Sequence, residues 1–298
     1  MRMNWIFLSL LGPLFWTASN FIDKYVLGKH SKGIFDFLFF STITSWLFFV
    51  IILLFNGLPV FSIYHLIPIA TGIILIYSYG FYAKALEQGE TSALVILFKL
   101  IPVVTLILGF IFLGQTLSKN ELWGFAIVFI GTLIVSFEKT ERKLIKGFGM
   151  IIIAILLWSI LTLMIDYGLT KMTFWDYFVF DTLGSGLAGL ALFIIPKIRK
   201  EVLTGIKTAK INKYLWYTGN NIFDFAGQMC AKGALAIAPS AALVVVVNQA
   251  QSFYAIIIGA LLTVFIPSSF KENIKADALI KKIIGAVIMF FGVYLLLV

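Results

Sequence analysis

The sequence predicts an all-α membrane protein with ten transmembrane helices, arranged as two five-helix repeats of inverted topology. Of its 298 residues, 61% are hydrophobic and only 12% are charged. Soluble domains are about one quarter charged, so the bilayer is the expected solvent of this chain. Ten apolar runs, separated by charges, Pro and Gly, provide the helices, and the last five runs repeat features of the first five in the same order.

The apolar runs have the length that a membrane crossing requires. Each is close to the ~20 residues that span the hydrocarbon as a helix. The runs lack the alternation of a barrel strand, so helices are expected, with every backbone polar group bonded inside the segment. The first run lacks a cleavage site and contains Trp16, so it is expected to be retained rather than removed as a signal peptide. The predicted helices span 4–22, 34–55, 66–86, 92–113 and 119–137, then 147–165, 175–195, 214–235, 240–266 and 279–298.

The two sets of helices match along the chain, which predicts two repeats, 1–137 and 147–298. Each repeat holds an odd number of helices, so the second must enter the membrane from the opposite side, as in many transporters. The offset between matching residues changes only where loops intervene, as expected of a duplicated unit. The matching pairs are Trp16 with Trp158, Asp23 with Asp166, Lys84 with Lys232, Ser92 with Ser240, Gly124 with Gly285, and Gly131 with Gly292.

A polar stripe marks the predicted helix 214–235. Its residues are Tyr217, Asn221, Asp224, Gln228 and Lys232, whose spacing of 4, 3, 4 and 4 places them on one helical face. Asp224 is expected near the bilayer midplane, where an ionisable side chain is costly and is usually functional. It is a candidate to exchange a proton, bind a substrate ammonium group or pair with a lysine. A polar stripe on a membrane helix should face a cavity, so Tyr217, Asn221 and Gln228 are also candidates to bind the solute or the coupling ion. For Asn221 and Gln228, hydrogen bonds that only join helices are the alternative.

A second polar cluster interrupts the apolar run 240–266. Asn248, Gln251 and Ser252 share a face there, and amides both donate and accept hydrogen bonds, which suits an uncharged polar or zwitterionic solute. Helix-to-helix bonding is again the alternative. Lys99, about 10 Å into the membrane, is a candidate to bind an anionic group or a buried acid. Trp16 and Trp158 lie mid-helix at matching positions and are candidates for the cavity wall, with simple packing as the alternative.

Other features limit the chemistry. Asp181 and Lys232 are expected at the same depth and predict an ion pair. His30 and His65 are too few and too far apart to suggest a metal site, and Cys230 is the only cysteine. No cofactor is expected. The net charge of +9 comes from Lys and Arg between the apolar runs, so it indicates orientation and no nucleic-acid partner. The expected partners are a small solute, membrane lipid and, as candidate coupling ion, a proton.

Several motifs resemble the EamA-like drug/metabolite transporters. The run from Tyr82 to Ala93, the stretch 100–105 with Pro102, and the Leu-Gly before Gln115 resemble their first repeat, together with Gly124 and Gly131. Residues 16–24 resemble their first helix. The resemblance implies two EamA units of five helices and the transport of a solute, without naming it. The chain departs from the pattern at Gln115, where the family usually has an acidic residue, and in an insertion before the last helix.

Charge and resemblance imply opposite orientations. Loops after the odd-numbered predicted helices hold 17 Lys and Arg, and the other side holds 3. The positive-inside rule therefore predicts both termini outside. The resemblance implies both termini inside. In either orientation, the chain is expected to cross the plasma (inner) membrane several times.

The sequence favours a secondary active transporter or facilitator that moves a small polar or zwitterionic metabolite by alternating access. It has no Walker-type loop, so ATP is not expected to drive transport directly. The alternative is an intramembrane enzyme acting on a lipid-linked substrate, which needs a catalytic cluster such as His with Asp or Ser. A membrane scaffold without transport is a third possibility, against which the midplane acid argues.

Overall fold

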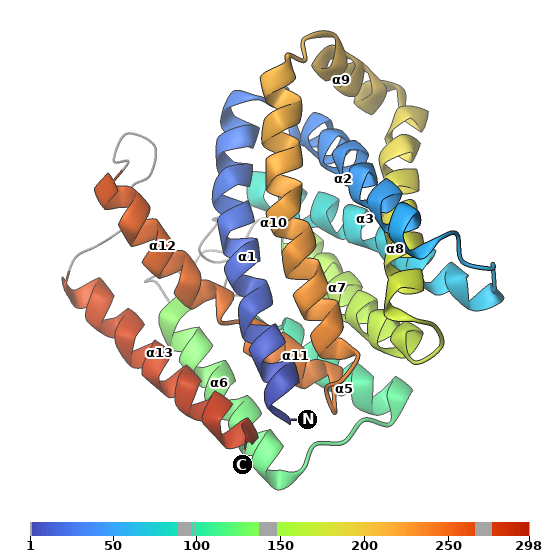
Figure 1. Ribbon diagram of the computed structural model, residues 1–298. Helices are drawn as coiled ribbons and strands as arrows, with labels where there is room; N and C mark the ends of the chain where they lie inside the picture. The colour runs from blue at the N-terminus through green and yellow to red at the C-terminus, as the bar shows by residue number, and fades with distance from the viewer. Residues whose placement is uncertain (1, 89–96, 98, 137–147, 266–275, 298) are drawn as a thin grey trace.

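The computed structural model describes residues 2–88, 97, 99–136, 148–265 and 276–297, which form helices and no strands (Figure 1). The first half contains α1 (Arg2–Lys29), α2 (Ile34–Asn56), the short η1 (Ile63–His65), α3 (Leu66–Gln88), α5 (Ile101–Leu113) and α6 (Lys119–Ser136). The second half contains α7 (Phe148–Leu169), α8 (Phe174–Ala191), the short η2 (Leu192–Ile194), α9 (Pro196–Lys207), α10 (Ile211–Leu235), α11 (Ala241–Asn248), α12 (Gln251–Phe265) and α13 (Ala276–Leu297).

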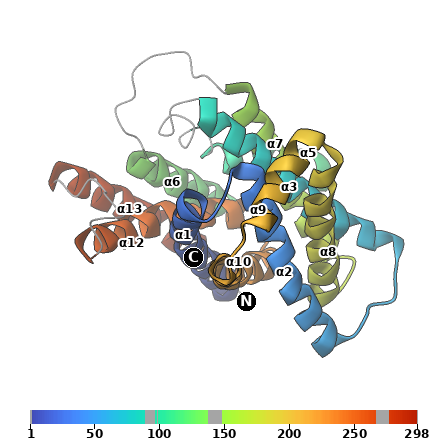
Figure 2. The same ribbon diagram turned by 90° about the horizontal axis from the view of Figure 1, so that it is seen from above.

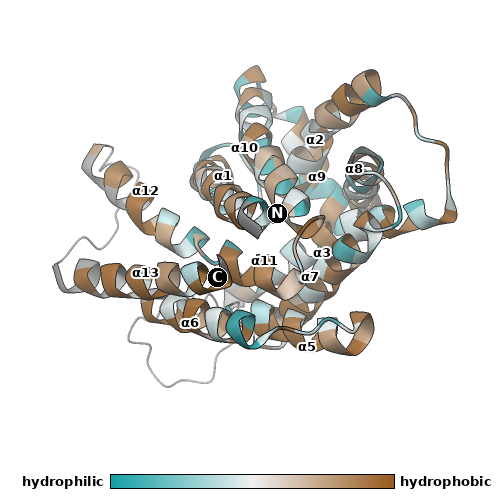
Figure 3. Ribbon diagram, turned by 60° about the horizontal axis from the view of Figure 1, so that its bottom comes forward, coloured by the Kyte–Doolittle hydropathy of each residue, from teal (hydrophilic) through white to brown (hydrophobic). Residues whose placement is uncertain are grey.

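The helices carry the apolar surface of an integral, multi-pass membrane protein. Within the described ranges, six helical segments are long and apolar enough to cross a membrane, and two shorter helices are also apolar. Apolar residues predominate along the helices, which are largely brown in Figure 3, and many large apolar side chains are exposed, among them Phe55 at 85%. The 25 residues of α10 would extend about 38 Å, enough to cross, but its polar residues lower its hydropathy.

Helices of the first half pack in pairs against helices of the second half. α1 packs along α10 and α7 along α3, and α2 contacts α10 as α8 contacts α3. If α1, α2 and α3 are matched with α7, α8 and α10, each of these contacts has a counterpart between the matching helices, as expected of two repeated halves. The helices α6, α12 and α13 lie together to one side of the others (Figures 1 and 2).

Glycines bring α6 and α13 into close contact. A Cβ atom on Gly131 would lie 2.7 Å from the carbonyl oxygen of Gly285, and one on Gly292 would lie 2.7 Å from the backbone nitrogen of Val128. These glycines therefore permit the close approach of two helix backbones.

The structure extends the first predicted helix and adds a helix that was not predicted. The first helix extends beyond 22 to Lys29, so Asp23 lies inside it rather than in a loop. The segment between the predicted helices 175–195 and 214–235 contains α9, which the sequence analysis missed. Pro196 is well placed to begin this helix. Val202 and Gly205 are buried on its inner face, which packs against α2 and η2.

The predicted single helix 240–266 was wrong, because a turn at Gln249–Ala250 separates α11 from α12. The backbone N–H groups of Gln249 and Ala250 bond three residues back, to Val246 and Val247 at 3.1 and 3.0 Å. A similar turn at Lys99–Leu100 precedes α5, where Pro102 lies in the first helical turn. The earlier part of the predicted helix 92–113, residues 92–96 and 98, lies outside the described residues, as does the link 137–147.

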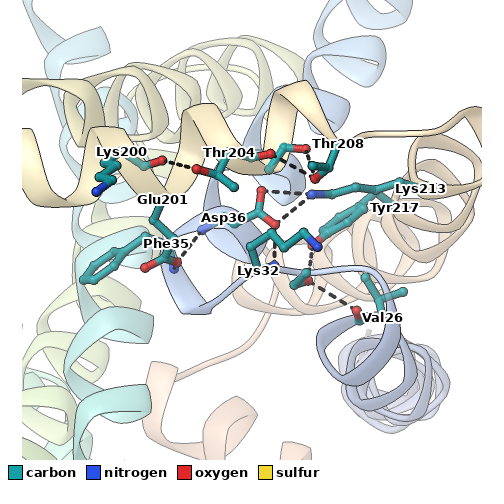
Figure 4. Close-up of polar contacts among 12 residues, drawn as sticks. Val26, Lys32, Phe35, Asp36, Lys200, Glu201, Thr204, Thr208, Lys213 and Tyr217 are labelled. Carbon is teal, nitrogen blue, oxygen red and sulfur yellow. Dashed lines mark hydrogen bonds and ion pairs between the residues drawn. The ribbon is translucent and has the colours of Figure 1, made fainter.

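A buried ion pair and a capping carboxylate join three helices at one end of the bundle (Figure 4). Lys213 Nζ of α10 lies 2.7 and 2.9 Å from the two carboxylate oxygens of Asp36 of α2, and both side chains are buried. Glu201 of α9 accepts hydrogen bonds from the backbone N–H groups of Phe35 and Asp36 at 2.9 and 3.1 Å. A carboxylate at this position caps the N-terminus of α2 and satisfies free N–H groups. These contacts hold α9 across the ends of α2 and α10.

Candidate solute-binding cavity

The centre of the bundle contains two adjoining cavities, one of about 210 Å³ and one of about 120 Å³. The larger is lined from α1, α3, α5, α7, α8, α10, α11 and α12 and by Lys99 just before α5; the smaller extends towards α2. Both halves of the chain therefore contribute to these two adjoining cavities, which contain several charged and polar side chains. The residues that line both cavities are Ser19, Asp23, Leu75, Tyr79, Asp181, Asp224, Gln228 and Lys232.

Two carboxylates form an acidic side of the cavity. Asp224 of α10 accepts a hydrogen bond from the Gln228 amide at 3.2 Å, and Asp23 of α1 accepts one from the Asn220 amide at 2.5 Å. Asn220 and Asp224 are one turn apart on α10, so the two carboxylates are neighbours. Within the described part of the chain, neither acid forms an ion pair. Neutral amides are a weak substitute for a counter-charge, so this side of the cavity favours a proton or a cationic group.

Lys232 and Asp181 form the ion pair expected from the sequence. Lys232 Nζ lies 2.5 Å from Asp181 Oδ2, and the other carboxylate oxygen accepts a 2.7 Å hydrogen bond from the Thr71 hydroxyl. The ammonium group also lies 4.5 Å from the centre of the Phe178 ring. Each charge is thus compensated within the protein, so these residues are less available to a solute than Asp23 and Asp224.

A positive charge, that of Lys99, lines the larger cavity near the turns that precede α5 and α12. Lys99, at the turn before α5, donates a 2.5 Å hydrogen bond to the Ser252 hydroxyl in the first turn of α12. Asn248, Gln249 and Gln251 line the larger cavity at the break between α11 and α12. Asn248 Oδ1 is buried, with no hydrogen-bond partner among the described residues. Interrupted helices commonly bind substrates in transporters, because their polar groups are free to face the cavity.

Aromatic rings form part of the wall. Trp16 and Trp158, the matching tryptophans of the two halves, both line the larger cavity. The Trp158 ring meets the Tyr79 ring edge to face, with centroids 4.8 Å apart. Trp16 packs over Gly227, where an added Cβ would lie 2.6 Å from its ring. Both tryptophans therefore lie where a solute would contact them.

Three predicted site residues have other surroundings. Tyr217 is fully buried and is not among the residues that line either cavity; its hydroxyl forms a 2.6 Å hydrogen bond with the Ser31 hydroxyl. Asn221 lines the smaller cavity, but its amide donates to Thr44 Oγ1 at 2.6 Å and joins α10 to α2. Ser252 is a partner of Lys99. The polar stripe of α10 is therefore divided between helix contacts at one end and cavity lining at the other.

The sequence analysis did not identify several residues that line the cavities. The most important of them is Asp23, because it is one of the two acids on the acidic side. Its match with Asp166 in the second repeat was a signal, but the predicted end of the first helix placed it outside the membrane. Asn20, Tyr79 and Thr162 also line the larger cavity and belong to helices whose other polar residues formed no clear stripe. Among the described residues, no group of three or more His, Cys, Asp or Glu is arranged to hold a metal ion.

Comparison with known proteins agrees with this architecture. Twenty-six chains of solved structures match; one, known from a crystal structure, aligns over 98% of both chains with a TM-score of 0.64 and 15% identity, which shows a shared fold. No curated protein matches this chain. The family model of the EamA-like transporter family matches residues 3–137. This match confirms the EamA resemblance and places the segment 3–137, just under half of the chain, in the EamA-like transporter family.

Proposed function

We propose that this protein is a secondary active transporter or facilitator that moves a small polar or zwitterionic organic solute through its central cavity by alternating access. The observation that carries the proposal is a cavity built from both halves, with two acids that form no ion pair among the described residues on one helix pair, and a lysine with amides at the helix breaks. A solute with a cationic and an anionic group would complement both sets. Desolvated charges are costly without a partner, so such a solute would gain from binding here.

The proposal includes ten membrane crossings in two inverted repeats, 1–137 and 147–298, in the plasma (inner) membrane. The exchanged contacts of α1 with α10 and α7 with α3 support it. Two halves that can exchange conformations would open the cavity to one side and then the other. The turns at Lys99–Leu100 and Gln249–Ala250 would serve as flexible points, and the Lys99–Ser252 bond would link them.

A proton is the proposed coupling ion, with Asp23 and Asp224 as its site. Two neighbouring carboxylates in a desolvated cavity repel each other unless a proton or a cation reduces their charge. A cationic group of the solute and the proton would then compete for the same acids. The intramembrane enzyme finds less support, since His30 packs with Tyr25 and His65 with Phe180, neither among the residues that line the cavity.

Counterflow in proteoliposomes tests the proposal. Purified protein would be reconstituted with an unlabelled solute inside, and entry of its labelled form would be followed for amino acids, sugars, nucleosides and quaternary amines. We expect protein-dependent exchange of a polar or zwitterionic member of this panel, reduced in Asp224→Asn and unchanged in Glu121→Gln, an acid outside the cavity. Exchange of none of the four classes by a correctly folded protein, or equal exchange by both variants, would contradict the proposal.

A further inference from the structure

The outer face of α9 carries a cluster of positive charge that the transport proposal does not use. Lys197, Arg199, Lys200 and Lys207 are exposed on this helix, and Lys210 is exposed just after it. The helix has one acid, Glu201, whose Oε1 is bonded to the N-terminus of α2. We call these five exposed cations the α9 basic face.

Exposed apolar side chains lie beside the α9 basic face. Leu203 on α9 is 40% exposed, and Ile194 and Ile195, immediately before the helix, are 79% and 52% exposed. On a surface that faces only water, exposing these apolar side chains next to the cations would not be favourable. A helix that lies in a membrane interface typically presents apolar residues to the acyl chains and cations to the headgroups.

The position of α9 agrees with the membrane interface. It begins one residue after η2, which continues the membrane-crossing α8, and three residues separate it from α10. In Figure 1 it lies across the top of the bundle, at the ends of α8 and α10. The helix α8 is apolar and long enough to cross the bilayer, and α10 is one of the ten proposed crossings. The short connections to these two helices would keep α9 at the level of the lipid headgroups.

We propose that the α9 basic face binds the headgroups of anionic phospholipids in the membrane that surrounds the protein. The lipid is chosen by charge complementarity: phosphate-bearing headgroups with net negative charge match five cations, and the acyl chains match Leu203, Ile194 and Ile195. A soluble polyanion would match the charges and leave these three apolar side chains in water.

The site is rigidly connected to the cavity. Gly205 on the inner face of α9 lies so close to Asp36 that an added Cβ would clash with its carboxylate. Asp36 binds Lys213 at the start of α10, and three turns further along this helix is Asp224. Anionic lipid bound to α9 would therefore stabilise the arrangement of α2 and α10, which together form one wall of the smaller cavity.

The test measures which lipid contacts α9, and it requires no transport. In a Cys230→Ala background, Thr204→Cys would place a fluorophore on the exposed face of α9. The protein would be reconstituted in phosphatidylcholine vesicles with 30% phosphatidylglycerol, and one of the two lipids would carry bromine quenchers at equal mole fraction. We expect stronger quenching by brominated phosphatidylglycerol, and a smaller difference in 0.5 M salt, because salt screens exposed charges.

A variant that removes three of the cations shows whether the α9 basic face causes the preference for the anionic lipid. In the triple variant Lys197→Gln, Arg199→Gln and Lys200→Gln, the preference for phosphatidylglycerol should fall about fivefold for each cation removed. The matched control, Lys119→Gln with Lys171→Gln, removes exposed cations elsewhere and should keep the preference. Equal quenching by the two lipids in the protein with all its cations would overturn the proposal, and so would a preference that survives in the triple variant.

Discussion

The side-chain amide of Gln115 joins Asp166 to the beginning of α11. Gln115 Nε2 donates a 2.5 Å hydrogen bond to Asp166 Oδ2, while its Oε1 accepts bonds from the Ser240 hydroxyl and the Ala241 N–H at 3.1 and 3.2 Å. An acidic residue, usual at this position in EamA-like proteins, could accept the same bonds but could not donate to Asp166. The departure at Gln115 and the presence of Asp166 are therefore complementary.

Gln115→Glu should destabilise the protein by about 1–3 kcal/mol, because it removes a donor to Asp166 and places two carboxylates in contact. Adding Asp166→Asn should restore most of the loss, since the new amide can donate to the new carboxylate. Thermal unfolding of both single variants and the double variant, combined in a double-mutant cycle, measures the coupling. Equal unfolding temperatures for Gln115→Glu and the unmodified protein would show that this amide bridge contributes nothing to stability.

The sequence was sufficient for the fold where hydrophobicity alone decides the structure. The helices α2, α3, α6, α7 and α13 begin and end close to their predicted bounds, because long apolar runs end at charges and glycines. α9 was missed because it is short and carries many charges. Its inner face is defined by contacts with α2, which a search for apolar runs does not detect.

The site was predictable where polar residues follow helical spacing. Asp224, Gln228 and Lys232 formed such a pattern, and all three line the cavity. Asp23 was missed because α1 continues for seven residues beyond its predicted end. The break between α11 and α12 was missed because Gln249 and Ala250 are not helix breakers. Their turn depends on contacts in three dimensions.

Removing the positive partner of the Asp181–Lys232 pair should be costly. Lys232→Met leaves the Asp181 carboxylate buried with one hydrogen bond from Thr71, and we expect a loss of about 3–5 kcal/mol in the free energy of unfolding. The control is Lys84→Met, the matching lysine of the first repeat, which is exposed and should change stability by less than about 0.5 kcal/mol. Adding Asp181→Asn to Lys232→Met should recover stability. Similar losses for Lys232→Met and Lys84→Met, measured by chemical unfolding in detergent, would contradict this account.

The expected orientation rests on the asymmetry of 17 Lys and Arg on one side of the predicted helices against 3 on the other, which should place α9 at the cytoplasmic face of the membrane and both termini outside. Single cysteines at Lys207 and Lys119, in a Cys230→Ala background, report opposite ends of the bundle. A membrane-impermeant maleimide added to intact cells should label Lys119→Cys and leave Lys207→Cys unlabelled until the membrane is permeabilised. External labelling at Lys207 would favour the orientation that the EamA resemblance implies.

Replacing the cavity acids should separate transport from folding. Asp224→Asn and Asp23→Asn nearly preserve volume and keep one hydrogen-bonding oxygen, but each removes a negative charge and an exchangeable proton. If the two acids bind the coupling proton, either variant should lose accumulation driven by an imposed pH gradient. The apparent affinity for a cationic or zwitterionic solute should fall about tenfold to hundredfold, since a hydrogen bond to a charged group is worth about 1.5–3 kcal/mol.

The neutral residues of the cavity provide the contrast. Gln228→Ala and Asn248→Ala should each weaken the apparent affinity, because both amides line the cavity. Asn248→Ala should also leave the response to the pH gradient intact, whereas Gln228→Ala removes the hydrogen bond to Asp224 and should change that response. Uptake against pH in proteoliposomes, with a thermal-stability assay on the same preparations, distinguishes these effects. Unchanged transport with a lowered unfolding temperature in Asp224→Asn would mean that this carboxylate is structural, and the acidic side of the cavity would then have no role in coupling.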